Sequence, residues 1–223
     1  MHRIFCIATI FILLSFPQEL LRAGAGPSDL TVSYSIGVRG KKGSNMGIGE
    51  TYNGGVETLF AGSGRMRIRL VSLMRIQSVF MSGDNDQSRK FTIVKESGKN
   101  KYVTSLSEKE WKTYNKKYDG AVCKLTEDTA QVLRFVCKKA IITLKDGKTI
   151  TAWYTTAIQS PAYAYLEPAF SSIPGLVLKY EYVYRKKTLS YTATAVSRNP
   201  IAREVFAIPD TGRSTRSADP SKD

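Results

Sequence analysis

Histidine and cysteine are scarce in this chain of 223 residues, which contains one histidine and three cysteines. The histidine is His2, in an N-terminal segment that we expect to be removed, so the mature protein would contain no imidazole. Imidazole is the usual general base near neutral pH and a leading metal ligand. Its absence argues against Ser-His-Asp and Cys-His catalysis, histidine-ligated haem and most zinc sites. We therefore expect no cofactor and no metal.

The N-terminus has the layout of a secretory signal peptide over residues 1–25. Arg3 supplies positive charge, residues 4–16 form an apolar run, and residues 23–25 (Ala-Gly-Ala) form a cleavage site of the A-x-A type. The run is shorter than the roughly 20 apolar residues of a membrane-spanning helix. The alternative is an uncleaved anchor or a buried helix. We expect cleavage near Ala25 and a periplasmic or secreted protein.

Two cysteines, Cys123 and Cys137, follow this segment. In an oxidising compartment an even count suggests a disulfide, and a hairpin that turns near residues 128–130 would place the two thiols opposite each other. Such a bond would stabilise the fold by about 3 kcal/mol. The alternative is two separate buried thiols, because free cysteine packs as a small hydrophobe. No obvious base lies nearby, so we do not expect a catalytic cysteine.

Alternating apolar and polar residues predict strands along most of the chain. The clearest are residues 176–184 (LVLKYEYVY) and 189–196 (LSYTATAV), and residues 203–209 (REVFAIP) form a last short strand. Ser107 can cap a helix within residues 105–118, and the Pro-rich residues 159–175 form a long connection with a short helix. Nearly ten turn-linked strands predict an antiparallel sheet with one packed face and one wet face.

The chain is expected to form a single β-rich domain over residues 26–210, with a disordered tail over residues 211–223. Asp146-Gly147 is the strongest short hairpin signal in it. A two-residue type I′ turn at this dipeptide would pair Ala140 with Trp153.

Two segments resemble a known family. Residues 132–158 (VLRFVCKKAIITLKDGKTITAWYTTAI) are similar to its pattern of a strand, Cys-Lys-Lys-Ala, a hairpin and a Trp-Tyr-Thr strand. Residues 170–182 (FSSIPGLVLKYEY) are similar to its Gly-Leu-Pro-Gly-Leu-Ile signature and the alternating strand that follows, with Ser-Ile-Pro-Gly-Leu-Val in place of the signature. Residues 89–208 together resemble the GLPGLI-like and related domain-of-unknown-function proteins that bacteria export to the cell envelope.

This resemblance places Cys137 on a family position and carries no established activity. A remote likeness of the family to LolA-like lipoprotein carriers implies a fold that is mainly β, with a curved antiparallel sheet (half-barrel) and one or two short helices.

A curved sheet can leave a cavity lined by its apolar face. We therefore expect the protein to bind an apolar ligand, such as a lipid, or a lipoprotein or other lipidated partner. The expected ligand-binding residues are Trp153, Phe170, Leu176, Leu178, Tyr180, Tyr182 and Tyr191. The alternative is that these side chains simply form the core, since alternating strands always produce such a face.

The formal net charge of +14 suggests a second role, docking on an anionic envelope component. The residues expected at this surface are Arg65, Arg67, Arg69, Lys186 and Lys187. The alternative is a solvated face that keeps the protein soluble. We do not expect nucleic acid as a partner, because export separates the chain from most of it and the aromatic residues lack a stacking-platform motif.

Catalysis by carboxylates is the third hypothesis. The acidic residues considered are Glu167, Glu181, Asp119 and Asp128, none of which forms a recognisable pair in the sequence. Glu167, in the Pro-rich connection, is the one that merits a test. We expect the protein not to be an enzyme and assign no catalytic residue.

Overall fold

The computed structural model describes residues 29–40, 48–62, 64–83, 89–98, 100–159, 163–184 and 186–209. The expected signal peptide and the expected C-terminal tail both lie outside these residues.

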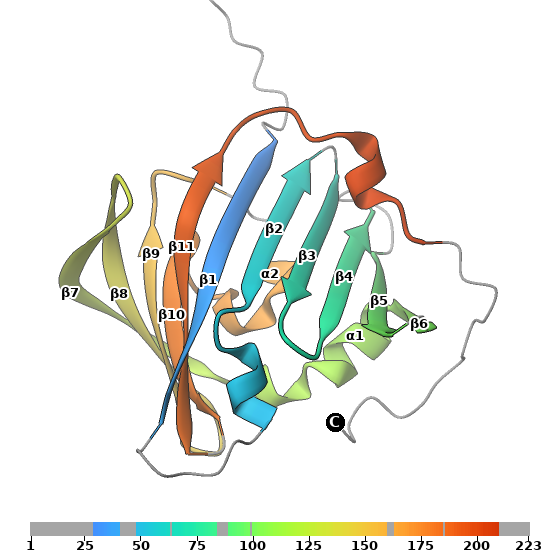
Figure 1. Cartoon of the computed structure of the whole chain (residues 1–223). Helices are drawn as coiled ribbons and strands as arrows, with labels where there is room; N and C mark the ends of the chain where they lie inside the picture. Colours follow the sequence, from blue (N-terminus) through green and yellow to red (C-terminus); the bar gives the residue numbers. More distant parts are fainter. Residues whose placement is uncertain are drawn as a thin grey trace, which may run out of the picture.

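The described residues form one antiparallel sheet of 11 strands in the order β6-β5-β4-β3-β2-β1-β11-β10-β9-β8-β7. Figure 1 shows that the sheet is curved and that β6 and β7 form its two separate edges. This confirms the expected fold class. The strands are β1 (Leu30–Gly40), β2 (Val56–Gly62), β3 (Arg65–Val71), β4 (Ile76–Ser82), β5 (Lys90–Ser97), β6 (Asn100–Ser107), β7 (Val122–Val132), β8 (Phe135–Thr143), β9 (Thr149–Thr155), β10 (Leu176–Tyr184) and β11 (Lys187–Ser197).

All but one of the strand pairings join neighbours in the sequence. The exception is β1 with β11, which connects the N-terminal half of the sheet to the C-terminal half. In this pairing Tyr34 lies opposite Ala193 and Ile36 lies opposite Tyr191. The pairing therefore places residues from opposite ends of the chain side by side on one face.

Short helices lie on both sides of the sheet. The α-helices are α1 (Glu108–Tyr114) and α2 (Tyr163–Leu166), and the 3-10 helices are η1 (Ile48–Tyr52), η2 (Lys116–Tyr118), η3 (Pro168–Phe170) and η4 (Arg203–Phe206). Figure 1 shows α1 and α2 behind the central strands, where their buried side chains join the core. No helix of the described residues has the length and apolar character needed to cross a membrane.

Helix α1 begins where the sequence predicts. The Ser107 hydroxyl accepts a hydrogen bond from the Glu110 backbone N–H, and the Glu110 carboxylate accepts one from the Ser107 N–H. This capping box satisfies backbone donors that the first turn leaves unpaired. Trp111 and Tyr114 face the core, and the Trp111 ring stacks on Phe91 of β5 at 4.6 Å.

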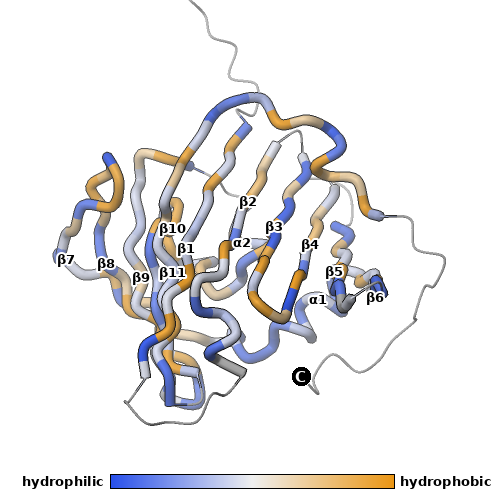
Figure 2. The backbone as a smooth tube through the Cα atoms, viewed as in Figure 1, coloured by the Kyte–Doolittle hydropathy of each residue, from blue (hydrophilic) through white to orange (hydrophobic). Residues whose placement is uncertain are grey.

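The core lies on the inner face of the sheet, beneath α1, α2 and η3. On β3 the buried Met66 and Ile68 alternate with the half-buried Arg65, Arg67 and Arg69. Figure 2 colours the backbone by hydropathy and shows hydrophilic and hydrophobic residues along the strands of this part of the sheet. The period of two that predicted these strands thus also separates the packed face from the outer face.

Gly175 holds the Pro-rich connection tightly against β9. A Cβ atom at this position would lie 2.2 Å from the Thr155 carbonyl oxygen. Only glycine permits this close approach, which brings the connection down onto the inner face of the sheet before β10 begins.

The hairpin at Asp146-Gly147 exists, but its predicted register is wrong. Ala140 pairs with Ala152, and Trp153 pairs with Lys139. The Gly147 N–H donates to the Leu144 carbonyl, and Gly147 has φ of 79°. The turn is therefore a type I turn followed by a left-handed glycine, a three-residue connection, which shifts the pairing by one residue relative to a two-residue turn.

The predicted disulfide is also wrong. Cys123 and Cys137 are free thiols. The hairpin between β7 and β8 turns at Leu133 and Arg134, later than expected, so Cys137 lies opposite Ala130 and Cys123 opposite Ile142. At about 3.3 Å per residue, the five positions between Cys137 and Ile142 separate the thiols far beyond the reach of a disulfide.

The last predicted strand, residues 203–209, is instead the 3-10 helix η4 and an extended end. Its residues lie on the outer face of the sheet, where the Arg67 guanidinium donates to the Val205 carbonyl at 2.9 Å. The arginines of β3 thus hold this segment against the outer face of the sheet. It forms no strand because it does not pair with either edge strand of the sheet, β6 or β7.

Candidate functional site

A cavity of about 660 Å³ lies between the inner face of the sheet and the segments that cover it. This volume is within the range of small-molecule sites. Its sheet wall comes from β2, β9, β10 and β11, its opposite wall from η2, Glu167 and η3, and its rim from the turn between β8 and β9. The lining includes Glu57, Glu167, Phe170, Tyr180, Tyr182 and Tyr191, with Lys117, Asp146 and Lys148 among the charged residues.

Two glutamates face this cavity from opposite walls. Glu57 lies on β2, opposite Tyr34 of β1, on the same face as the buried Leu59. Glu167 lies between α2 and η3, where its backbone N–H donates to the Tyr163 carbonyl at 2.8 Å. The sheet therefore positions one carboxyl group and the Pro-rich connection positions the other.

Both glutamates are half-buried, and the desolvation of their carboxyl groups raises the pKa of each. The pKa of Glu57 rises to about 7, and a hydrogen bond from the Tyr180 hydroxyl at 3.3 Å opposes part of this shift. The pKa of Glu167 rises to about 8, first because of burial and then because of the negative charge of Glu57, against the opposing effect of Lys117. The pair consequently holds protons near neutral pH, where most carboxyl groups are ionised.

Stacked tyrosines form the sheet wall of the cavity. The rings of Tyr180 and Tyr191, which pair directly across β10 and β11, stack at 4.4 Å with an angle of 8° between their planes. Tyr182 extends the stack, and the Phe170 ring meets Tyr180 edge-on at 5.1 Å. Burial raises the pKa of Tyr180 and Tyr191 well above the usual value and that of Tyr182 to about 12, so these phenols remain neutral.

Two further tyrosines, Tyr34 and Tyr163, connect the sheet to the segment that covers its inner face. The Tyr34 hydroxyl donates to the Val177 carbonyl at 2.8 Å, and Tyr34 is also hydrogen-bonded to Tyr163 of α2. These bonds join β1, β10 and α2. They fix the position of the sheet relative to the connection that carries Glu167.

The structure brings together four of the seven residues predicted to bind a ligand. Phe170, Tyr180, Tyr182 and Tyr191 line the cavity. Leu176 and Leu178 are fully buried at 0 % exposure and belong to the core. Trp153 pairs with Lys139 and Lys179, and its ring lies 5.7 Å from the Lys139 ammonium, away from the cavity lining.

The five basic residues predicted at an anionic surface do not act as one set. On the outer face, Arg67 is engaged by Val205 and Ser78, and Arg65 lies 5.3 Å from the Phe206 ring. Lys187 is only 6 % exposed and forms an ion pair with Glu50, so it is not a surface cation.

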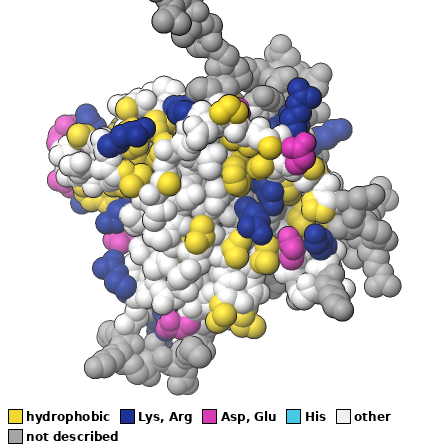
Figure 3. Space-filling model, turned by 45° about the horizontal axis from the view of Figure 1, so that its top comes forward, with side chains coloured by type: hydrophobic (Ala, Val, Ile, Leu, Met, Phe, Trp, Pro, Cys, Tyr) yellow, Lys and Arg dark blue, Asp and Glu magenta, His cyan; other side chains and the backbone are white. Residues whose placement is uncertain are grey.

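Lys186 lies exposed at the β10–β11 turn, apart from the half-buried Arg69 of β3. On the face shown in Figure 3 the Lys and Arg side chains form separate groups among hydrophobic and uncharged ones.

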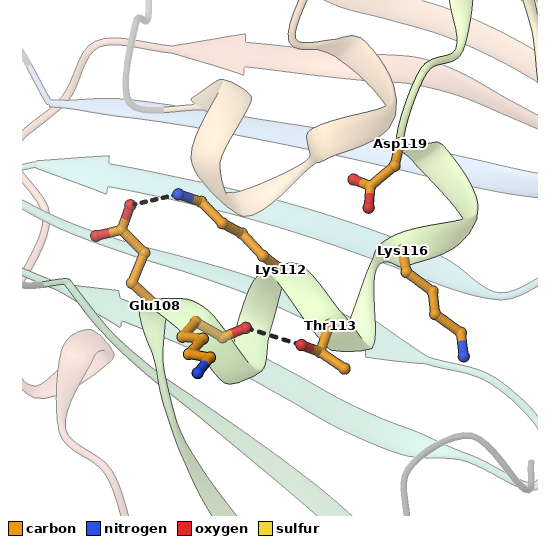
Figure 4. A pocket seen from close by; sticks show the side chains of 6 residues that line it. Glu108, Lys112, Thr113, Lys116 and Asp119 are labelled. Atoms are coloured by element: carbon orange, nitrogen blue, oxygen red, sulfur yellow. Dashed lines mark hydrogen bonds and ion pairs between the residues drawn. The ribbon is translucent and has the colours of Figure 1, made fainter.

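Of the four carboxylates considered from the sequence, only Glu167 lines the cavity. Glu181 forms an ion pair with Arg39 at 2.9 Å, and Asp128 forms one with Lys139 at 2.9 Å. Asp119 borders a shallow depression beside α1, shown in Figure 4, whose charged side chains include the Glu108–Lys112 ion pair. The described residues contain no cluster of three or more potential metal-ligating acidic, cysteine or histidine side chains.

Sequence reasoning missed Glu57, the partner of Glu167. The signal that could have identified it is the alternation of VETLFAG, which places Glu57 on the same face as Leu59 and Ala61. Burying an acidic residue on the packed face of an alternating strand costs folding free energy unless the charge is paired or hydrogen-bonded, so such a residue is a candidate for a functional role.

The comparisons with known proteins concern the fold. Neither a family model nor a curated protein matches the sequence. An uncharacterised conserved protein from Thermus thermophilus has a similar fold, with 6% identity, a TM-score of 0.50 and coverage of 85% of this chain and 91% of that one. Its likeness, at this identity, extends to the fold alone.

Two further structures overlap less closely. PNGF-II has 16% identity and a TM-score of 0.47 over 85% of this chain, which spans 31% of the PNGF-II chain. The Mycobacterium tuberculosis lipoprotein LppX has 11% identity and a TM-score of 0.38 over 77% of this chain and 88% of its own. The resemblance to GLPGLI-like proteins stays a prediction, since no family model matches.

Proposed function

We propose that this chain is an exported binding protein without catalytic activity, which holds an apolar ligand or the lipid chain of a partner in the tyrosine-lined cavity. The observation that carries the proposal is the cavity itself: about 660 Å³ on the inner face of the curved sheet, walled by aromatic rings. Aromatic walls with a few convergent polar groups are typical of ligand sites.

The acid pair favours binding over catalysis. In enzymes that use two carboxyl groups, the environment pushes their pKa values apart, so that one is ionised while the other is protonated. Here burial raises both pKa values in the same direction, to about 7 and about 8, and does not push them apart. Docking on an anionic envelope component has less support, because Arg67 and Lys187 are engaged within the protein.

Filling part of the cavity is expected to weaken ligand binding. Ala169 lines the cavity from η3, and an Ala169→Phe side chain would occupy part of its space. Adding 1-decanol should stabilise the unmodified protein, by about 2.7 kcal/mol when the ligand is at 100 times its Kd, whereas the variant should gain less than a third of this. Thermal unfolding followed by circular dichroism measures the shift.

The matched control is Ala202→Phe, which adds the same ring at an exposed position before η4. This variant should respond to 1-decanol like the unmodified protein. Equal stabilisation of both variants would contradict the proposal.

A further inference from the structure

We infer that the cavity selects a ligand whose polar end is a cation, an ammonium group on an apolar tail, and that Glu57 and Glu167 receive this group. The inference rests on the proposed function and specifies its ligand class.

The two carboxyl groups line the same cavity, so both can contact one bound ligand. Glu57 reaches the cavity from β2, and the Tyr180 hydroxyl holds one of its oxygens at 3.3 Å. Glu167 reaches the same cavity from the covering connection, and its pKa responds to the charge of Glu57. A ligand bound in this cavity would therefore meet carboxyl groups from both walls.

The charges around the cavity do not balance. Its charged lining consists of three acids and two bases: Glu57, Glu167, Asp146, Lys117 and Lys148. Asp146 and Lys148 neutralise each other as an ion pair at 2.5 Å on the rim. Lys117, which also lies 4.8 Å from the Tyr118 ring, is then the only base among the lining residues that remains for the two glutamates.

Among the described residues, the other titratable groups near the pair include six phenols that burial keeps neutral. They are Tyr34, Tyr163, Tyr180, Tyr182, Tyr191 and Tyr118. Neutral phenols can donate hydrogen bonds to a carboxylate but cannot supply the missing positive charge. Without a ligand, both groups retain protons near neutral pH, first because desolvation disfavours the carboxylate form and, for Glu167, also because of the negative charge of Glu57.

An ammonium group would supply the missing charge. It would replace the retained proton, and each carboxyl group would ionise with an opposite charge beside it. A carboxylate head group would add a further negative charge beside Glu57 and Glu167, and a hydroxyl head group would leave their negative charge without a counter-charge. The net charge of +14 acts mainly through exposed side chains, whose field is screened over about 8–10 Å of salt solution, whereas charges inside the cavity are screened much less.

Three ligands with the same tail separate these possibilities: decylamine, 1-decanol and decanoic acid, titrated calorimetrically at pH 6 and pH 8.5. Decylamine carries its charge at both values, because an alkylamine titrates near 10.4. We expect decylamine to bind at least tenfold more tightly than either of the others at pH 8.5. We also expect its affinity to rise at least tenfold from pH 6 to pH 8.5, with release of protons at pH 6.

The variants Glu57→Gln and Glu167→Gln should each lower the ratio of decylamine to 1-decanol affinity at least tenfold at pH 8.5. The control Glu181→Gln removes an acid of β10 that pairs with Arg39, outside the cavity, and should leave this ratio unchanged. Equal affinities for the amine and the alcohol, or a ratio that survives both glutamate variants, would overturn the inference while leaving the cavity as a binding site. Failure of all three ligands to bind would overturn the proposed function itself.

Discussion

Replacing both Glu57 and Glu167 with glutamine is expected to stabilise the protein at alkaline pH. In the folded state the pKa values of these groups are about 7 and about 8, against 4.5 as the ordinary value. Between pH 4.5 and 8 the folded state therefore holds more protons than the unfolded chain. The free energy of unfolding contributed by this pair is greatest below pH 4.5 and falls as pH rises through the folded pKa values.

The expected loss in the unmodified protein is on the order of 2–5 kcal/mol by pH 9, since one pKa unit corresponds to about 1.4 kcal/mol and part of the shift relaxes. The double variant should match the unmodified protein at pH 5 and exceed its free energy of unfolding at pH 9. Urea denaturation at several pH values measures both curves. A difference that stays constant from pH 5 to 9 would show that the pair is not buried together.

Trp111→Ala is expected to destabilise the protein by about 3–5 kcal/mol, the usual cost of emptying a large aromatic site in a core. Trp111 is 5 % exposed and stacks between Phe91 at 4.6 Å and Tyr114 at 5.5 Å. Its indole N–H donates to the Tyr165 carbonyl at 2.8 Å, which ties α1 to α2. The substitution removes both the packing and the partner of that carbonyl.

The second tryptophan provides the control for this prediction. Trp153 is half-buried and meets Lys139 on a different part of the sheet, so Trp153→Ala should cost only about 1 kcal/mol. Urea denaturation followed by circular dichroism compares the two variants without relying on tryptophan fluorescence. Similar losses in both would mean that Trp111 does not join α1, β5 and α2 as described.

Local sequence patterns predicted most of the strands because each depends on neighbouring residues. The alternation of residues 176–184 predicted β10, and the cap at Ser107 predicted the start of α1. Register was harder, because it depends on turn geometry. At Asp146-Gly147 a type I turn with a left-handed glycine replaced the expected two-residue turn, and this moved Trp153 from opposite Ala140 to opposite Lys139.

The cysteine prediction failed for a related reason. The Glu127-Asp128-Thr129 segment reads as a turn, but it lies within β7, and the pairing of β7 with β8 shifts between Leu125 and Thr129. These turn-forming residues instead produce an irregularity in the pairing of the edge strand β7 with β8. The thiols therefore stay apart.

The candidate site could be predicted only in part, because it depends on contacts between distant parts of the chain. The alternation of β10 and β11 identified Tyr180, Tyr182 and Tyr191. The Glu57–Tyr180 bond joins residues 123 positions apart and requires β1 to pair with β11. No local pattern predicts that pairing, so the sequence suggested Glu167 alone and left its partner unrecognised.

The most direct test of the account is a carboxyl-carbon NMR titration of protein labelled with ¹³C-glutamate. The measurement tests whether Glu57 and Glu167 lie half-buried in one cavity on the inner face of the sheet. Two resonances, assigned by their loss in Glu57→Gln and Glu167→Gln, should titrate at about pH 7 and about pH 8. Titration of both resonances near pH 4.5, as for exposed glutamates, would contradict the account.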